Sequence, residues 1–377
     1  MAATPLQQFI GQKQLTRTLG TLVAGAQSRG EALPHILLVG PSGVGKTLLA
    51  KQVAREYSNT GATASITNLI HLVAGPDVTV RAVVKILVSL PAFSIVFVDE
   101  VHGLRPDVQE CLYLALDELR TYSICEDGSL DRATLSSVAA FTLIAASNMP
   151  GKIRKALRAR LHVFHFEAYS VDEIRRISER IAEERQIDIT TQALRFIADR
   201  SRSSPREARK LLELVRVGCP RARLELPAVR LFLNERGIDD HGLDITQRLA
   251  LRHLAAARSH SLSHEVLATK LGMDSPYVRQ EVEPFLVQQE LIDIVASNRR
   301  RRITSAGLAI VQQDAQRSEA VPAADDGAAS VVPPRIDGSL EHQQIAPHQE
   351  TRESDERCAL PAQAATQDNG TTEVRPW

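Results

Sequence analysis

Residues 34–47, with the sequence PHILLVGPSGVGKT, decide the fold class of this 377-residue chain. Gly40–Thr47 matches the pattern G-x-x-x-x-G-K-[ST] in full. The apolar run before it, Ile36–Val39, is typical of a buried strand, and residues 46–57 after it carry apolar side chains at helical spacing. A glycine-rich loop between strand and helix turns backbone N–H groups toward a polyphosphate, and the helix N-terminus favours negative charge there. The pattern therefore predicts a phosphate-binding loop.

Each polar position of this loop has an expected task. Lys46 neutralises the β- and γ-phosphates of ATP, and the Thr47 hydroxyl ligates Mg²⁺. The remaining expected nucleotide contacts are the backbone of three glycines and the first residue of the helix beyond the threonine: Gly40, Gly43, Gly45 and Leu48.

Two further apolar runs end in polar residues. The first, residues 94–98, ends in Asp99 and Glu100, and the second, residues 141–146, ends in Ser147 and Asn148. We expect Asp99 to hold Mg²⁺ through water and Glu100 to act as the base toward the attacking water. Asn148 either positions water at the γ-phosphate or is an ordinary turn or helix-capping residue. Strands apolar along their whole length, separated by helices, predict a parallel sheet covered on both faces. ATP hydrolysis follows from the phosphate loop and the acidic pair together.

The pattern along the chain predicts four parts. Residues 1–167 form the α/β nucleotide-binding core, and residues 168–236 form a small all-helical lid domain. Residues 240–313 read as three short helices and a two-stranded ribbon, which is a winged helix. Residues 314–377 lack Phe and Tyr and are rich in Ala, Pro, Gln, Asp and Glu, so we expect a disordered acidic tail.

The charge distribution supports this division. The chain holds 45 Lys and Arg against 45 Asp and Glu, which excludes nucleic-acid binding by bulk positive charge. The tail alone holds 12 acidic and 5 basic residues, so the first 313 residues carry a compensating positive excess. No apolar segment is long enough to cross a bilayer and no secretion signal precedes the core, so we expect a cytoplasmic chain without a membrane partner.

Arginines offer several candidate sites. Arg299, Arg300, Arg301 and Arg302 follow one another between the two strands of the predicted ribbon, where they either contact DNA phosphates or form an ordinary charged hairpin loop. Arg160 and Arg206 are candidates for stabilising charge on the transferred phosphoryl group. His162 and His165 alternate with apolar residues, so we interpret them as strand residues and not as metal ligands.

Several segments resemble the AAA+ ATPases and, within them, the RuvB family of Holliday-junction branch-migration motors. The resemblance runs over roughly residues 6–310. The AAA+ segments are Gly40–Thr47, Asp99–His102, Phe141–Asn148, Leu157–Arg160 and Ser204–Arg206, and segments specific to RuvB include Phe9–Gln12, residues 29–37 and Glu283–Gln289.

The resemblance implies roles for individual residues. Phe9 and Ile10 would lie beside the adenine, and Tyr169 would close that pocket. Asn148 matches the sensor of the γ-phosphate, Arg160 the arginine finger offered to the next subunit, and Arg206 the lid arginine that reads nucleotide in its own subunit.

The same resemblance implies partners. These are duplex or four-way junction DNA bound by the winged helix, a homo-hexameric ring, and a RuvA-like protein docked on a hairpin matching residues 120–140. That segment is more polar than an apolar docking hairpin, which argues against RuvA binding. Three functions therefore stay open: a branch-migration motor, a divergent loader or regulatory ATPase, and a winged-helix DNA-binding protein whose ATP site only controls assembly.

Overall fold

The computed structural model describes residues 4–58, 69–125, 127–219, 222–297 and 299–319. The predicted tail lies outside the described residues from position 320 onward. Its predicted start at residue 314 is wrong, because residues 314–319 continue helix α14 (Ser305–Glu319). Within the described part of the chain, no helix is both long and apolar enough to cross a bilayer.

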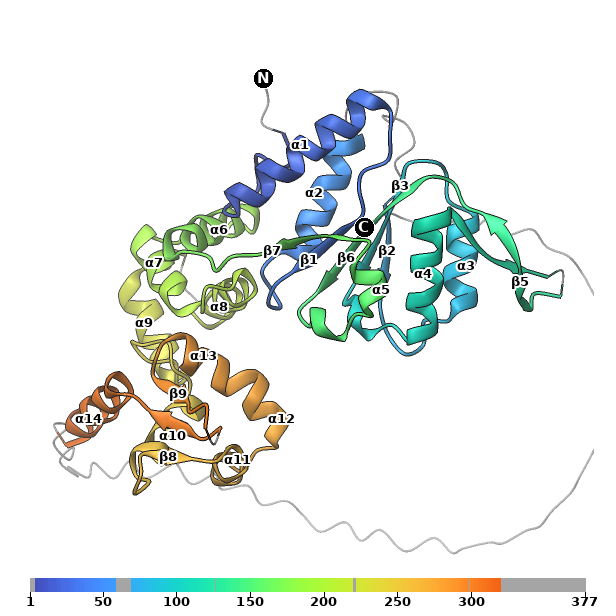
Figure 1. The fold of residues 1–377 in the computed structure, drawn as a ribbon. Coiled ribbons are helices and arrows are strands. Elements are labelled where there is room, and N and C mark those ends of the chain that lie inside the picture. Colours follow the sequence, from blue (N-terminus) through green and yellow to red (C-terminus); the bar gives the residue numbers. More distant parts are fainter. Residues whose placement is uncertain (1–3, 59–68, 126, 220–221, 298, 320–377) are drawn as a thin grey trace, which may run out of the picture. The chain divides into compact units, whose positions relative to one another are not determined.

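A five-stranded parallel sheet forms the first part, as predicted (Figure 1). Side chains alternate along each strand, so Ile36 and Leu38 join one core while Leu37 and Val39 join the other. Because both faces are covered there, strand Ile36–Val39 is apolar and buried throughout, whereas the edge strand His162–His165 has an exposed histidine at each end. In spatial order the strands are β2 (Leu69–Val73), β3 (Ser94–Asp99), β6 (Phe141–Ser147), β1 (Ile36–Val39) and β7 (His162–His165).

Helices cover the two faces separately (Figure 1). Helices α1 (Lys13–Arg29) and α2 (Lys46–Ser58) pack on one face, and α3 (Val80–Val88) and α4 (Pro106–Glu118) pack on the other. Shorter elements connect them: the 3₁₀ turns Val101–Gly103 and Pro150–Lys152, helix α5 (Lys155–Arg158) and the antiparallel hairpin of β4 (Arg120–Ile124) and β5 (Leu130–Ser137).

The second part is entirely helical apart from one isolated bridge. Its first helix, α6 (Val171–Glu184), begins with a capping box, in which Ser170 and Glu173 bond each other's backbone N–H. Helix α8 (Pro205–Gly218) begins with a proline at its first turn. Helices α7 (Thr191–Arg200) and α9 (Leu226–Glu235) complete its core.

The third part is a winged helix with one strand more than predicted. Strand β10 (Arg301–Ile303) pairs antiparallel with β9 (Ile292–Ile294) and also with β8 (Ser261–Leu262). The helical stretch 275–288 is divided because Pro284 has no N–H to continue the helical ladder. Its helices are α10 (Ile245–Ala255), α11 (His264–Leu271), α12 (Ser275–Tyr277), the π turn Val278–Val282, α13 (Glu283–Gln288) and α14.

Candidate nucleotide-binding site

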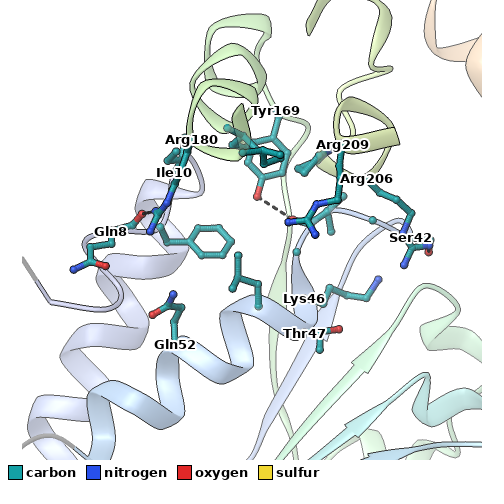
Figure 2. Close-up of a pocket in the computed structure, with 18 of the residues that line it drawn as sticks. Gln8, Ile10, Ser42, Lys46, Thr47, Gln52, Tyr169, Arg180, Arg206 and Arg209 are labelled. Carbon is teal, nitrogen blue, oxygen red and sulfur yellow. Dashed lines mark hydrogen bonds between the residues drawn. The ribbon is translucent and has the colours of Figure 1, made fainter. Parts of the chain in front are cut away.

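A cavity of about 550 Å³ opens above the glycine-rich loop, between the start of α2, the segment before α1 and the lid helices α6 and α8 (Figure 2). Most of the predicted nucleotide-site residues line it: Phe9, Ile10, Gly43, Gly45, Lys46, Thr47, Leu48, Asp99, Glu100, Tyr169 and Arg206. The chain thus brings together side chains that lie up to nearly two hundred positions apart.

The glycines of the loop allow a close approach between core and lid. Gly43 and Gly45 have φ of 84° and 100°, which favours glycine. A Cβ at Gly43 would lie 2.6 Å from the Cβ of Arg206. Gly40 is not among the lining residues, and a Cβ there would lie 2.8 Å from the Cβ of Phe166. Gly40 is therefore required for packing at the end of β1.

Lys46 lies at the floor of the cavity and is buried. Its Nζ donates to the carbonyls of Gly40 (2.9 Å) and Pro41 (2.8 Å). Burial lowers the pKa of Lys46, while the carboxylates of Glu100 and Asp99 oppose that shift. An ammonium group held only by neutral carbonyls is placed to bind a phosphate that enters the cavity.

The metal-ligating pair predicted from spacing lies in contact. The Thr47 hydroxyl donates to Asp99 Oδ2 at 2.7 Å, and the other carboxylate oxygen accepts the N–H of Glu100. Hard divalent cations prefer such oxygen ligands, so the donor set fits Mg²⁺.

Glu100 adopts a left-handed conformation with φ of 52°. Its Oε2 is buried and accepts no hydrogen bond within the described residues, although His102 Nδ1 lies 3.3 Å away. His102 Nδ1 also lies 3.1 Å from the hydroxyl of Ser147 at the end of β6. Sequence reasoning missed His102 as a neighbour of the catalytic pair, because only its place two residues after Glu100 signals it.

Asn148 does not line the cavity; its side chain is exposed. The inward position at the end of β6 belongs to Ser147, whose hydroxyl contacts His102 and accepts the N–H of Met149. The role of Asn148 at the γ-phosphate stays a prediction that the chain alone does not support.

The opposite end of the cavity is lined largely by apolar side chains, with the polar Gln8, Gln52 and Arg180 beside them. Phe9 and Ile10 line it together with Ile177 and Ile181 of α6. Tyr169 is buried and donates its hydroxyl to the carbonyl of Val44 at 2.9 Å, and burial raises the pKa of this phenol. Leu48 also lines the cavity and is half exposed. An aromatic and aliphatic pocket beside a phosphate loop suits a nucleotide base.

Two predicted arginines take different positions. Arg206 on α8 donates to the hydroxyl of Ser42 at 2.7 Å and lines the cavity, as does Arg209 one turn later, which sequence reasoning did not single out (Figure 2). Arg160 lies outside the cavity. Its guanidinium forms a bidentate pair with Asp117 and contacts the ring of Tyr113. Of the two predicted arginines, Arg206 faces the nucleotide site of its own chain and Arg160 does not.

The winged-helix arginines do not form one exposed basic tip, and that prediction is wrong for Arg301. Strand alternation turns Arg301 inward, where it is 7% exposed. Its Nε and a terminal nitrogen each donate to Glu283 at 2.7 Å, and Glu283 also contacts His264 Nδ1 at 2.8 Å. Arg301 therefore neutralises a buried carboxylate and does not face a DNA backbone.

The other three arginines reach the surface to different degrees. Arg299 and Arg302 are exposed, and Arg302 pairs loosely with Asp293 at 3.8 Å. Arg300 is partly buried and donates to the hydroxyl and carbonyl oxygens of Ser261.

Comparison with known proteins agrees with this geometry. Residues 1–166 match the model of the Holliday junction DNA helicase RuvB P-loop domain, and residues 240–312 match the RuvB C-terminal winged helix domain. The chain is 34% identical over 308 residues to the Holliday junction branch migration complex subunit RuvB of a Synechococcus strain, covering 80% of this chain and 82% of that relative. The Thermotoga maritima protein of the same name is 32% identical, with 75% and 84% covered.

Solved structures give the same result. The Thermotoga maritima RuvB Holliday junction branch migration motor superposes with a TM-score of 0.67 at 29% identity, covering 82% of this chain and 97% of that one. A proline-to-glycine mutant of that protein gives 0.68, with 82% and 98% covered. On this sequence similarity, matched by fold and by the nucleotide site, the chain belongs to the RuvB family of AAA+ ATPases.

Proposed function

We propose that this chain uses ATP hydrolysis to drive branch migration of Holliday junctions, in recombination and repair. One observation carries the catalytic part: Thr47, Asp99 and Glu100 converge on one wall of the cavity whose floor holds Lys46. These are the groups that phosphoryl transfer to water requires.

Each residue has a defined task in this proposal. Lys46 leaves the carbonyls of Gly40 and Pro41 to bind the phosphates. Thr47 and Asp99 would hold Mg²⁺, which would supply positive charge beside the phosphates. Glu100 takes a proton from the attacking water. Its buried Oε2 is suited to this task, because it accepts no hydrogen bond within the described residues, and His102 Nδ1 lies 3.3 Å from it.

Two arginines stabilise the negative charge on the transferred phosphoryl group. Arg206 acts within its own subunit through the lid, where it already contacts the loop residue Ser42. Arg160 serves the site of the next subunit in a homo-hexameric ring. Asp117 orients its guanidinium at the surface of the core, outside the cavity of its own chain.

DNA contact is assigned to the winged helix. Arg299 and Arg302 are the exposed cations of the wing, and contacts from them to phosphates position DNA without reading its sequence. The free thiols of Cys111 and Cys125 in the described part of the chain fit a reducing compartment, which supports placement in the cytoplasm.

A RuvA-like partner is the least supported element. The apolar residues Tyr122, Ile124 and Leu130 of the hairpin pack against the core below. Strand β5 presents Arg132 and Thr134 to solvent beside Ala133 and Leu135, so its outer face is part polar and not apolar throughout. This polarity favours a second candidate, a loader or regulatory ATPase that binds DNA without migrating branches.

The test measures ATP turnover and strand separation on a synthetic four-way junction, with and without purified RuvA. The proposal expects junction DNA to accelerate turnover and strands to separate only with ATP. If DNA does not change the rate of ATP turnover and no strands separate with or without RuvA, the proposed motor function is refuted. DNA-stimulated turnover without strand separation supports the loader.

A further inference from the structure

Gln52 is a buried amide in the nucleotide cavity that the established motifs do not explain. It lies on α2, is 8% exposed and lines the cavity. Neither end of its amide has a hydrogen-bond partner within the described residues. The three other buried glutamines each form hydrogen bonds: Gln12 bonds the backbone of Glu167 with both ends, and Gln109 bonds the backbones of Leu104 and Arg154. Gln247 accepts from Arg202 and the N–H of Asp244 through its Oε1, while its Nε2 has no partner within the described residues.

The amide is open to the cavity, since neither of its atoms is among the fully buried, unpaired atoms of the described residues. It becomes costly when a ligand covers it without pairing with it. Burying an unpaired polar group is unfavourable, and an aliphatic side chain of similar size would fill the same place without that cost. Figure 2 shows the Gln52 amide directed from α2 toward the side of the cavity where Gln8 and Ile10 lie. The amide is therefore presented to whatever occupies that side.

Its position along α2 places it at the base end of the cavity. Gln52 follows Lys46 by six residues, which is about 9 Å along a helix. Leu48, Gln52 and Arg55 recur at intervals of four and three residues, so they share the helix face that lines the cavity. The residues across this end include the apolar Phe9, Ile10, Ile177 and Ile181, and with them the polar Gln8, Arg180 and Glu184.

A base in such a pocket is gripped on its faces but not on its polar edge. The apolar side chains suit the faces of the ring, and they offer nothing to the amino group and ring nitrogen at its edge. A glutamine amide presents one acceptor and one donor in a plane, which matches the amino group and the adjacent ring nitrogen of adenine.

We propose that Gln52 hydrogen-bonds the edge of the base and makes this site selective for adenine. Its Oε1 accepts from the 6-amino group and its Nε2 donates to the neighbouring ring nitrogen. The inference rests on the proposed nucleotide function, and it adds a specificity-determining residue outside the phosphate loop, the acidic pair and the arginines.

The experiment is a binding cycle on the full chain without DNA. It measures the Kd of ADP and of purine riboside diphosphate, which lacks only the 6-amino group, for the wild type and for Gln52→Leu. The wild type should prefer ADP by about 10- to 100-fold, the range expected when a buried acceptor loses its donor. Gln52→Leu should bind both ligands with affinities within about threefold of each other.

Two further variants separate recognition from packing. Gln14→Leu makes the same chemical change on the exposed side of α1 and should keep the full preference for ADP. Gln52→Glu keeps the acceptor and loses the donor, so it should bind ADP more weakly while still preferring it over purine riboside diphosphate. The Gln52→Glu result tests the proposal even if the leucine variant disturbs the packing of α2.

The contrary outcomes are distinct. An unchanged ADP preference in Gln52→Leu overturns the inference and leaves the proposed function intact. If Gln52→Leu weakens the binding of ADP but not of 2′-deoxy-ADP, Gln52 contacts the ribose, and the inference is also overturned. A wild-type chain that binds neither ligand removes the nucleotide site, and with it both proposals.

Discussion

Replacing Arg301 by alanine should destabilise the winged helix, whereas the same change two residues earlier, at Arg299, should weaken DNA binding without loss of stability. The two arginines belong to one run of four in the sequence. They differ in exposure: Arg301 is buried against Glu283, and Arg299 is exposed.

The magnitude follows from what each side chain leaves behind. Arg301→Ala strands the Glu283 carboxylate, which is almost fully buried, with only His264 as a charged or polar partner. Removing one partner of a buried ion pair costs about 3–5 kcal/mol. Arg299→Ala removes an exposed group, which changes stability by less than about 0.5 kcal/mol. Its loss should remove about one unit from the slope of log affinity against log salt.

Amide exchange of the full chain, followed by peptide mass spectrometry, reads the stability of β10 and α13 directly. Arg301→Ala should lower protection there by about 100-fold or more, with no change in the nucleotide-binding core. The double variant Arg301→Met, Glu283→Leu should recover most of that protection, because a buried ion pair replaced by apolar groups is often neutral. Unchanged protection in Arg301→Ala, or equal losses of DNA affinity in Arg299→Ala and Arg301→Ala, refutes the division of tasks.

Three further outcomes are expected. Arg160→Ala and Glu100→Ala should each abolish ATP turnover when tested alone. Rings that mix the two variants should recover part of the turnover, because one protomer then supplies the base and its neighbour supplies the arginine. Mixed rings that are as inactive as the single variants contradict a site shared between subunits. Tyr169→Phe removes a bond to a backbone carbonyl of the phosphate loop and should weaken ADP binding by roughly three- to tenfold through about 1 kcal/mol, measured by calorimetry; unchanged affinity shows that the bond does not hold the loop. Burial, then the nearby charge of His162, lowers the pKa of His35 to about 4 from 6.5, so the unfolded chain takes up the proton first and stability should fall by roughly 3 kcal/mol as pH drops from about 6.5 to 4. Urea midpoints over that range should fall less steeply in His35→Ala, and equal slopes contradict this assignment.

The core was predictable because its signals are local. The strand, loop and helix at residues 34–57 are adjacent in sequence, and β3 and β6 can be recognised as apolar runs that end in polar residues. The carboxyl ends of parallel strands meet at one edge of a sheet, so the pairing of Thr47 with Asp99 follows from topology.

The errors arise where a side chain's direction depends on distant partners. Four consecutive arginines look alike in sequence, yet the pleat of β10 turns Arg301 toward a carboxylate 18 positions earlier. The third strand, β8, has two residues and therefore no visible pattern. Gln52 shares its helix face with Leu48, and only the folded cavity reveals that its amide is unpaired.

The central claim is that ATP hydrolysis at this site moves branched DNA. The most direct measurement follows separation of a labelled four-way junction into duplex arms by the wild type and by Glu100→Gln, which should still bind nucleotide. The account predicts ATP-dependent separation by the wild type and none by the variant at equal DNA occupancy. Separation by Glu100→Gln at the wild-type rate, or an ATP-hydrolysing wild type that leaves the junction intact, would contradict it.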